Sequence, residues 1–143
     1  MSLRVERVGL DLLPTCLELR RVVFIDEQGV PADEEVDGLD PLCTHFLAWN
    51  DDRPVGTARL WLTPDGRAKA QRVAVLAATR GQGVGAALMA ALEEEALRLG
   101  HAAVVLGAQL TAVPFYLRLG YLEQGEVFLD AGIPHRMMRR GLR

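Results

Sequence analysis

Hydrophobic and polar side chains alternate along much of the first half of the chain, which is the pattern of β-strands. Residues 3–8 (LRVERV) alternate apolar and charged side chains and predict an edge strand. Residues 44–50 (THFLAWN) and 54–63 (PVGTARLWLT) are rich in β-forming side chains and are separated by DDR, so they predict a hairpin. The turn PDGR and a further strand at 70–76 (AQRVAVL) follow. These patterns predict three antiparallel strands in succession.

Other segments repeat their apolar positions with the period of an α-helix. Such spacing predicts a helix within residues 11–27, followed by an acidic loop with one helical turn at about 32–36. Residues 83–99 carry a single apolar stripe, while Glu93 and Glu94 lie on the opposite side. This segment predicts a long amphipathic helix.

The last third of the chain predicts one parallel strand and a final hairpin. Residues 102–109 (AAVVLGAQ) are almost uninterruptedly apolar and follow the long helix, which is typical of a buried strand reached by a β-helix-β crossover. We expect this strand to run parallel to the one at 71–76. A short helix at 112–119 and a hairpin formed by 121–130 and 133–140 complete the chain.

Length, composition and charge favour a single globular domain. The chain has 143 residues, half of them hydrophobic, which is enough for one core, so we expect one domain over residues 1–143. The net charge of -3 argues against nucleic acid or an anionic membrane as a partner. No stretch has the length of a membrane span or resembles a signal peptide, which predicts a cytoplasmic protein. Cys16 and Cys43 show no disulfide pattern, and no metal-ligand spacing occurs, so we expect no metal.

Three glycines, Gly81, Gly83 and Gly85, stand at alternate positions where the long helix begins. Glycine has no Cβ atom, so successive backbone amides can approach one anion, and the helix N-terminus adds its dipole. Arg80 supplies a cation beside them. The loop therefore predicts a phosphate-binding site; the alternative is a glycine-rich turn that only starts a helix.

Two common phosphate-binding loops do not match this sequence. A P-loop needs Lys and then Ser or Thr after its second glycine, whereas residues 85–87 are Gly-Ala-Ala. A dinucleotide fingerprint needs its first glycine directly after a strand and an acid at the end of the next strand, but that strand ends in Gly-Ala-Gln at 107–109. We therefore do not expect a nicotinamide cofactor.

The segments RGQGVGA (80–86) and FYLRLGY (115–121), in this order with a helix and a strand between them, resemble the GNAT superfamily of acyl-coenzyme A dependent N-acetyltransferases. The segment at 20–40 followed by His45, and GIPHRMM at 132–138, are similar to the bacterial branch called ElaA-like or YjcF-like. This resemblance covers nearly the whole chain. It implies an α/β (α+β) fold, in which a mixed, twisted sheet of six or seven strands splays between strands 4 and 5 and is flanked by about four helices.

The same resemblance implies a site for acetyl-coenzyme A. The glycine loop would hold the pyrophosphate on its amides, the fourth strand would pair with the pantetheine arm, and a Val75 or Leu76 amide would polarise the thioester carbonyl. Gln109 stands where many relatives carry Asn, and its amide could bind that arm or equally satisfy the strand end. The residues expected at the coenzyme are Val73, Ala74, Val75, Arg80, Gly81, Gln82, Gly83, Val84, Gly85, Ala86, Gln109, Phe115 and Tyr116.

Tyr116 occupies the position of the family's tyrosine and is the candidate general acid for the departing thiolate; the alternative role is packing against the coenzyme. The route of the amine proton is open, because neither central strand carries an acid. Water, or loop residues on the acceptor side, could accept it: Glu27, Glu34, Glu35, Asp37, His45 and His135. The acids between 26 and 40 could also attract a cationic amine, or simply be solvated.

The sequence therefore predicts an acetyl-coenzyme A dependent N-acyltransferase that moves an acetyl group to a primary amine of a small molecule or peptide by direct attack. The alternative is a catalytically silent acyl-coenzyme A sensor, which the presence of Tyr116 disfavours. The acceptor, the use of other acyl groups, and the choice between a monomer and a homodimer are left open.

Overall fold

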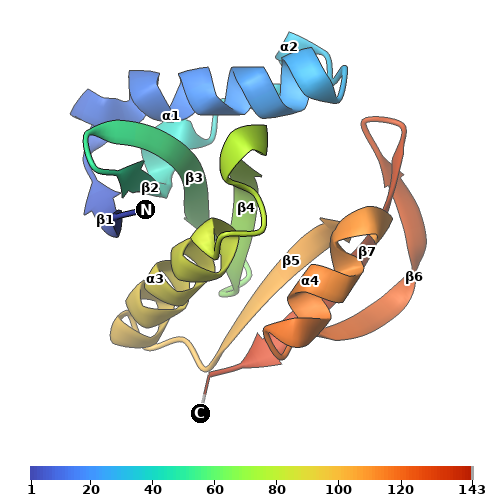
Figure 1. The fold of residues 1–143 in the computed structure, drawn as a ribbon. Helices are drawn as coiled ribbons and strands as arrows, with labels where there is room; N and C mark the ends of the chain where they lie inside the picture. Colours follow the sequence, from blue (N-terminus) through green and yellow to red (C-terminus); the bar gives the residue numbers. More distant parts are fainter. Residues whose placement is uncertain (143) are drawn as a thin grey trace.

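Seven strands form one mixed sheet in the computed structural model, which describes residues 1–142 (Figure 1). Their order across the sheet is β1-β2-β3-β4-β5-β7-β6, and β4 and β5 are parallel while the other neighbouring strands are antiparallel. The expected mixed sheet is therefore confirmed. The strands are β1 (Leu3–Val8), β2 (Thr44–Asn50), β3 (Arg53–Leu62), β4 (Ala68–Val75), β5 (Ala103–Gln109), β6 (Leu122–Asp130) and β7 (Ile133–Gly141).

Helices flank this sheet. The four α-helices of the described residues are α1 (Leu13–Arg20), α2 (Ala32–Glu35), α3 (Val84–Arg98) and α4 (Val113–Arg118). A π-helical segment, η2 (Arg21–Glu27), continues α1 directly, and single 3-10 turns are η1 (Leu10–Leu12), η3 (Asp40–Leu42), η4 (Ala77–Thr79) and η5 (Leu110–Ala112). Within residues 1–142, no helix combines the length and the apolar character needed to cross a membrane.

Two apolar clusters lie on opposite faces of the sheet, because successive side chains of a strand point to opposite sides. On β2, Phe46 and Ala48 belong to the larger cluster, which also contains the buried face of α3. Leu47, between them, packs instead with Cys16 and Leu19 of α1. The sheet is therefore covered by α3 on one face and by α1 on the other (Figure 1).

The apolar stripe of α3 forms much of the larger core. Val84, Leu88, Leu92 and Ala96 recur every four residues and are all buried. Fully burying a Val or Leu side chain contributes about 1.5–3 kcal/mol to the stability of the folded state. This packing confirms the expected amphipathic helix and fixes the position of its N-terminus beside β4.

The parallel pairing of β4 and β5 is short. Residues 68–70 pair with 104–106, and beyond them the two strands have no register in common. We expected β5 to lie parallel to residues 71–76; the direction is confirmed, but the paired residues come before that segment. Residues 71–75 of β4 therefore separate from β5, which confirms the expected splay between strands 4 and 5, and Figure 1 shows the strands diverging.

An irregularity in β4 accompanies the separation. The register between β3 and β4 shifts between Thr57 and Arg59, and Arg72 adopts a φ of 56°. A bulge of this kind increases the local twist of a strand and re-aims its side chains. The end of β4 therefore leaves part of its backbone facing the gap.

The final hairpin places β7, not β6, against β5. Gln109 at the end of β5 is paired with His135 of β7, and all nine residues of β6 are exposed at the sheet edge. Both strands were expected, but their order was not predicted, because the alternation of side chains within a strand does not identify its neighbour.

Candidate active site

The glycine loop presents backbone donors to open space at the start of α3. Gly81 and Gly83 have φ values of 77° and 84°, a region that side chains other than glycine disfavour. A Cβ atom built on either residue would meet nothing within 4 Å. Within the described chain, no backbone acceptor bonds the amides of residues 81–86, and the first such bond is from Ala87 N to Gly83 O, at 3.0 Å. The loop can therefore donate several hydrogen bonds to one anion.

Gly85 has a different reason to be glycine. A Cβ atom at this position would lie 3.0 Å from Cζ of Phe115, which is too close for an unshifted ring. The absence of a side chain lets Phe115 pack against the first turn of α3. The lack of a side chain at Gly85 therefore serves packing, while its backbone amide has no backbone acceptor within residues 1–142, like those of its neighbours in the loop.

The other side chains of the loop point elsewhere. Gln82 is exposed and its Nε2 donates to Ala78 O at 3.4 Å, Val84 is buried in the core, and Ala86 is half-buried. These three residues can therefore reach an anion through their backbone amides.

Arg80 connects the loop to two other segments. Its Nε donates to Val75 O at 3.0 Å, and its Nη2 forms an ion pair with Oε1 of Glu27 at 2.8 Å. The cation expected at the phosphates and one of the expected proton acceptors are therefore paired with each other. Both side chains are partly exposed, so an anion can compete for Arg80.

The free edge of β4 lies next to this loop. Leu76 N donates to Val55 O at 2.9 Å on the β3 side, so its amide is not available to polarise a thioester, contrary to one of the two expectations. Backbone groups of adjacent strand residues point to opposite edges, so the amide of Val75 faces the gap. Val73 lines the cavity described below, whereas the side chain of Ala74 is buried.

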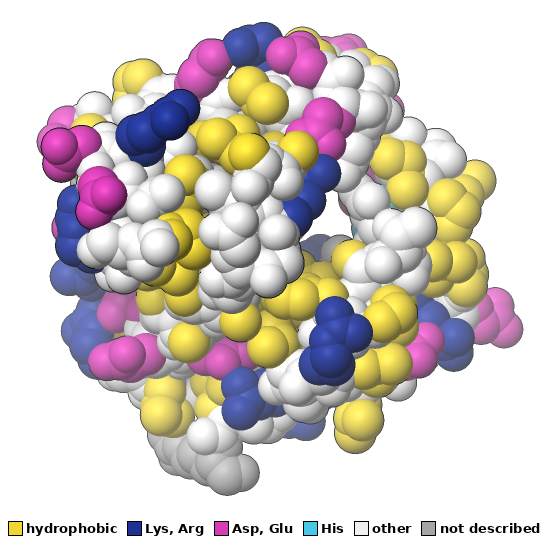
Figure 2. Space-filling model, in the orientation of Figure 1, with side chains coloured by type: hydrophobic (Ala, Val, Ile, Leu, Met, Phe, Trp, Pro, Cys, Tyr) yellow, Lys and Arg dark blue, Asp and Glu magenta, His cyan; other side chains and the backbone are white. Residues whose placement is uncertain are grey.

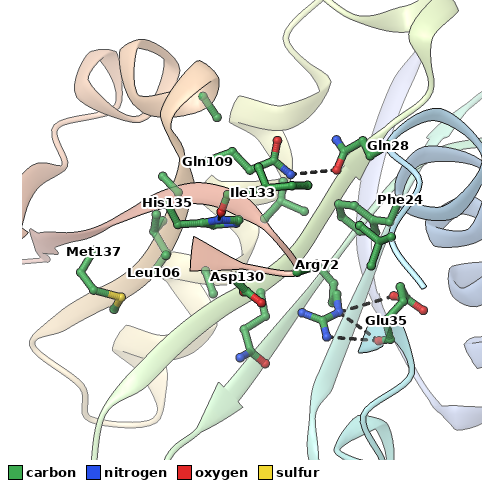
Figure 3. Close-up of a pocket in the computed structure, with 18 of the residues that line it drawn as sticks. Phe24, Gln28, Glu35, Arg72, Leu106, Gln109, Asp130, Ile133, His135 and Met137 are labelled. Atoms are coloured by element: carbon green, nitrogen blue, oxygen red, sulfur yellow. Dashed lines mark hydrogen bonds and ion pairs between the residues drawn. The ribbon is translucent and has the colours of Figure 1, made fainter. Parts of the chain in front are cut away.

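A cavity of about 260 Å³ lies where β4 and β5 separate. Its walls come from η2 and the following residues, from both central strands, and from the β6–β7 hairpin, and Figure 2 shows the surface hollowed between these segments. Figure 3 shows Phe24 and Gln28 on one side and His135 and Leu106 on the other. Such a volume accommodates a small molecule or one arm of a larger one.

Tyr116 of α4 lines this cavity and is 8% exposed. Its ring packs edge-on against Phe115 and Tyr121, with centroids 4.9 and 5.7 Å away. Burial raises the pKa of Tyr116 well above its usual value. The hydroxyl therefore keeps its proton at neutral pH and can act as a donor, although burial also makes it a weaker acid than a free phenol.

His135 lines the same cavity from β7 (Figure 3). Its Nδ1 lies 2.6 Å from Ile133 O, and its ring packs beside Phe128 with centroids 5.8 Å apart. A carbonyl oxygen only accepts hydrogen bonds, so Nδ1 carries a proton. In the neutral ring, Nε2 is then free to accept one.

His45, in contrast, lies outside the lining of this cavity. It is almost fully buried, and its Nε2 lies 2.8 Å from Asp40 O. The Asp40 carboxylate in turn pairs with Arg20 at 2.7 Å and with Arg59 at 2.9 Å. The structure therefore places His45 in a buried ionic network and does not bring it together with Tyr116.

Arginines neutralise most of the acidic segment. Glu35 pairs with Arg20 at 2.5 Å and with Arg72 at 3.4 Å, and Figure 3 shows the contacts between Glu35 and Arg72. Asp37 pairs with Arg59 at 2.6 Å and with Arg72 at 3.3 Å. Burial opposes ionisation of Asp37, but the hydrogen bonds and charges of the arginines outweigh it and lower the pKa of Asp37 to about 2. These carboxylates hold the segment on the sheet. Neither of the two expectations for the acidic segment, attraction of a cationic amine or simple solvation, accounts for this role.

Sequence reasoning missed these arginine partners. The one local signal was Arg20, a charged residue on the apolar side of a helix, where it is 1% exposed. Gln28 was also missed: its Oε1 accepts a hydrogen bond from Nε2 of Gln109 at 2.8 Å, which connects the residue after η2 to the end of β5 (Figure 3). Gln109 thus bonds another side chain instead of the end of its own strand.

Comparisons with known proteins agree with this geometry. The family model described as "Acetyltransferase (GNAT) domain" matches residues 27–142. The uncharacterized N-acetyltransferase YjcF of Bacillus subtilis strain 168 is 44% identical over 123 residues, 85% of this chain and 87% of YjcF. A crystal structure of an acyl-CoA N-acyltransferase from Pseudomonas aeruginosa superimposes with a TM-score of 0.84 at 35% identity, covering 98% of this chain and 99% of that one. Escherichia coli ElaA superimposes with a TM-score of 0.85 at 32% identity, covering 97% and 99%. By sequence and fold, the chain belongs to the GNAT acetyltransferase family, as a relative of YjcF and ElaA.

Proposed function

We propose that this protein is an acetyl-coenzyme A dependent N-acyltransferase that acylates a primary amine. The observation that carries this proposal is that two features lie beside the end of β4: the unbonded amides of residues 81–86, which follow this strand, and the β4–β5 gap, whose cavity Tyr116 lines. The loop is suited to a pyrophosphate and the gap to an extended arm. The GNAT family and fold support the same reaction class.

The residues of the gap would each perform one part of the transfer. The amine nitrogen attacks the thioester carbonyl carbon, the new C–N bond forms, and the C–S bond breaks. The Val75 amide would donate to the carbonyl oxygen as it gains negative charge. The Tyr116 hydroxyl would protonate the departing thiolate, which matches its position in the cavity.

The proton of the amine would leave through His135. Its Nε2 is free of the Ile133 contact, and the ring lines the same cavity as Tyr116. Of the five other candidates, Glu27, Glu35 and Asp37 are paired with arginines, and His45 is buried outside the cavity. We therefore favour His135, acting directly or through one water molecule.

Two measurements test the proposal and separate it from a silent acyl-coenzyme A sensor. Calorimetric titration with coenzyme A reports binding, and release of free thiol from acetyl-coenzyme A with a panel of amines reports transfer. A transferase gives both signals, and a sensor gives binding without amine-dependent thiol release. Failure to bind coenzyme A would overturn both functions.

We also propose that the protein is cytoplasmic and forms a homodimer. Two free cysteines, Cys16 and Cys43, agree with the reducing conditions of the cytoplasm. The exposed apolar side chains of β6, Leu122, Val127 and Leu129, favour a homodimer over a monomer, with no nucleic acid or membrane partner. Light scattering on the purified protein distinguishes the monomer from the dimer.

A further inference from the structure

The cavity contains the one lysine of the chain. Lys and Arg total 16, and every one of them except Lys69 is an arginine. Lys69 lies on β4 opposite Val105 of β5, within the short paired stretch that precedes the separation of the strands. It therefore lines the cavity at the closed end of the gap.

The charge of Lys69 has no protein partner within residues 1–142: no ion pair or hydrogen bond joins its ammonium group. Arg72, the other Lys or Arg side chain of the lining, is occupied by the carbonyl oxygens of Glu34 and Glu35 and by the carboxylate of Asp37. Burial lowers the pKa of Lys69 below its usual value, nearby arginines add to this effect, and Asp130 opposes it. A bound carboxylate would supply the missing counter-charge.

An acidic group faces the same space without being paired to Lys69. Asp130, at the end of β6, lines the cavity (Figure 3), and among the described residues it forms no ion pair. The cavity therefore presents Lys69 and Asp130, a cation and an anion that are close enough to interact but are not in contact, and the acidic residue Glu34 also lines it from α2. Apolar side chains complete its walls: Phe24, Val30, Leu106, Phe128, Ile133 and Met137.

We propose that the acceptor is a small amine that also carries a carboxylate, of the free amino acid class, and that Lys69 binds this carboxylate while Asp130 receives the ammonium end. This inference rests on the proposed function and names the substrate class of the same site. The apolar walls would contact the side chain of the acceptor. The ammonium group must then lose its proton before attack, by the route through His135 described above.

Matched acceptors test this assignment. Alanine and ethylamine, leucine and 3-methylbutylamine, and phenylalanine and 2-phenylethylamine form three pairs in which only the carboxylate differs. The ammonium group of an amino acid has a lower pKa than that of a plain amine, so the two acceptors of a pair differ in reactivity as well. We therefore compare between variants the ratio of kcat/KM for the amino acid to kcat/KM for the plain amine. We expect Lys69→Met to lower the ratio of amino acid to plain amine at least tenfold for the best pair, and Lys69→Arg to retain more of it. Arg67→Met, which removes an exposed charge two residues away, is expected to leave the ratio unchanged. An equal loss with both acceptors, or an unchanged ratio in Lys69→Met, would overturn the inference.

A binding measurement separates this inference from the proposed function. Because Lys69 is the only lysine, reductive ¹³C-methylation labels it and the N-terminus alone and preserves the positive charge. We expect the dimethyl-lysine NMR signal of the wild-type protein with bound coenzyme A to shift saturably on addition of leucine, and not on addition of 3-methylbutylamine. No shift, or the same shift with both ligands, would refute the carboxylate site even if transfer to plain amines is observed. A leucine-specific shift without any transfer would support the site while removing the proposed function.

Discussion

Arg80 and Glu27 form an ion pair at 2.8 Å that joins the glycine loop to the end of η2, although the two residues are 53 positions apart in the chain. Because the amides beside Arg80 are open to an anion, the pyrophosphate of a coenzyme would compete with Glu27 for this guanidinium. The pair therefore connects the proposed coenzyme site with the segment that forms one wall of the cavity.

Removing the competing carboxylate is expected to strengthen coenzyme binding. An exposed ion pair contributes at most about 1 kcal/mol, so Glu27→Gln should increase the affinity for coenzyme A up to about fivefold. Arg80→Met should weaken binding. Calorimetry measures the affinity, and turnover assays on the same variants test whether Glu27 accepts the amine proton. If Glu27 is the acceptor, Glu27→Gln lowers kcat. We expect this variant to retain its kcat.

Gly83 and Gly66 offer a matched comparison. Both have positive φ, 84° and 88°, and a Cβ atom on either would meet nothing within 4 Å. Alanine at each position should therefore destabilise the fold to a similar extent, about 1–2 kcal/mol in denaturant unfolding. We expect Gly83→Ala alone to weaken coenzyme A binding, at least tenfold, because its methyl group lies at the open side of the anion loop. Equal affinities of the two variants would remove the loop from the coenzyme site.

Tyr116→Phe separates proton donation from packing. The ring is retained in this variant, so coenzyme affinity should change little, while kcat should fall by about 10² to 10⁴ if the hydroxyl protonates the thiolate. Since burial raises the pKa of Tyr116, the hydroxyl stays protonated through neutral and moderately alkaline pH. Deprotonation of Tyr116 should therefore not limit kcat below pH 10. A Phe variant with normal turnover would assign the residue to packing.

Acid should weaken the fold through Asp37. Its pKa is lowered to about 2 in the folded protein, against about 3.9 for an unperturbed aspartate. The unfolded chain therefore binds its proton at a higher pH, and the stabilisation is complete above about pH 5 and is lost as the pH falls towards 2. Denaturant unfolding between pH 7 and pH 3 is expected to show this decline, with a smaller slope in Asp37→Asn. Glu18→Gln, which changes an exposed pair with Arg21, serves as the control. Identical slopes in Asp37→Asn and the wild-type protein would exclude this contribution.

Most strands and helices, and the exposed glycine loop, could be predicted from the sequence alone, because they depend on neighbouring residues. A period of two or of 3.6 residues decides which face of a strand or helix is apolar, so β2, β3, α3 and the buried strand β5 could be predicted from their own residues. Gly81 and Gly83 were identifiable for the same reason, since a positive φ and an exposed amide are local properties. The resemblance to the acetyltransferase family added the separation of β4 from β5, which no local pattern indicates.

Which side chains come together in the cavity depends on the packing of the whole fold. In the sequence, His45 and His135 were both candidate proton acceptors. Packing of the chain buries His45 against Asp40 and places His135 in the cavity. Lys69 could not be identified from the sequence, because a single lysine in a strand belongs to no recognisable motif. Its importance depends on the absence of a partner within the described fold, and such an absence is a property of all the surrounding segments together. Contacts between distant residues depend on how the elements pack. The pattern of apolar and polar residues along a strand or helix does not specify that packing.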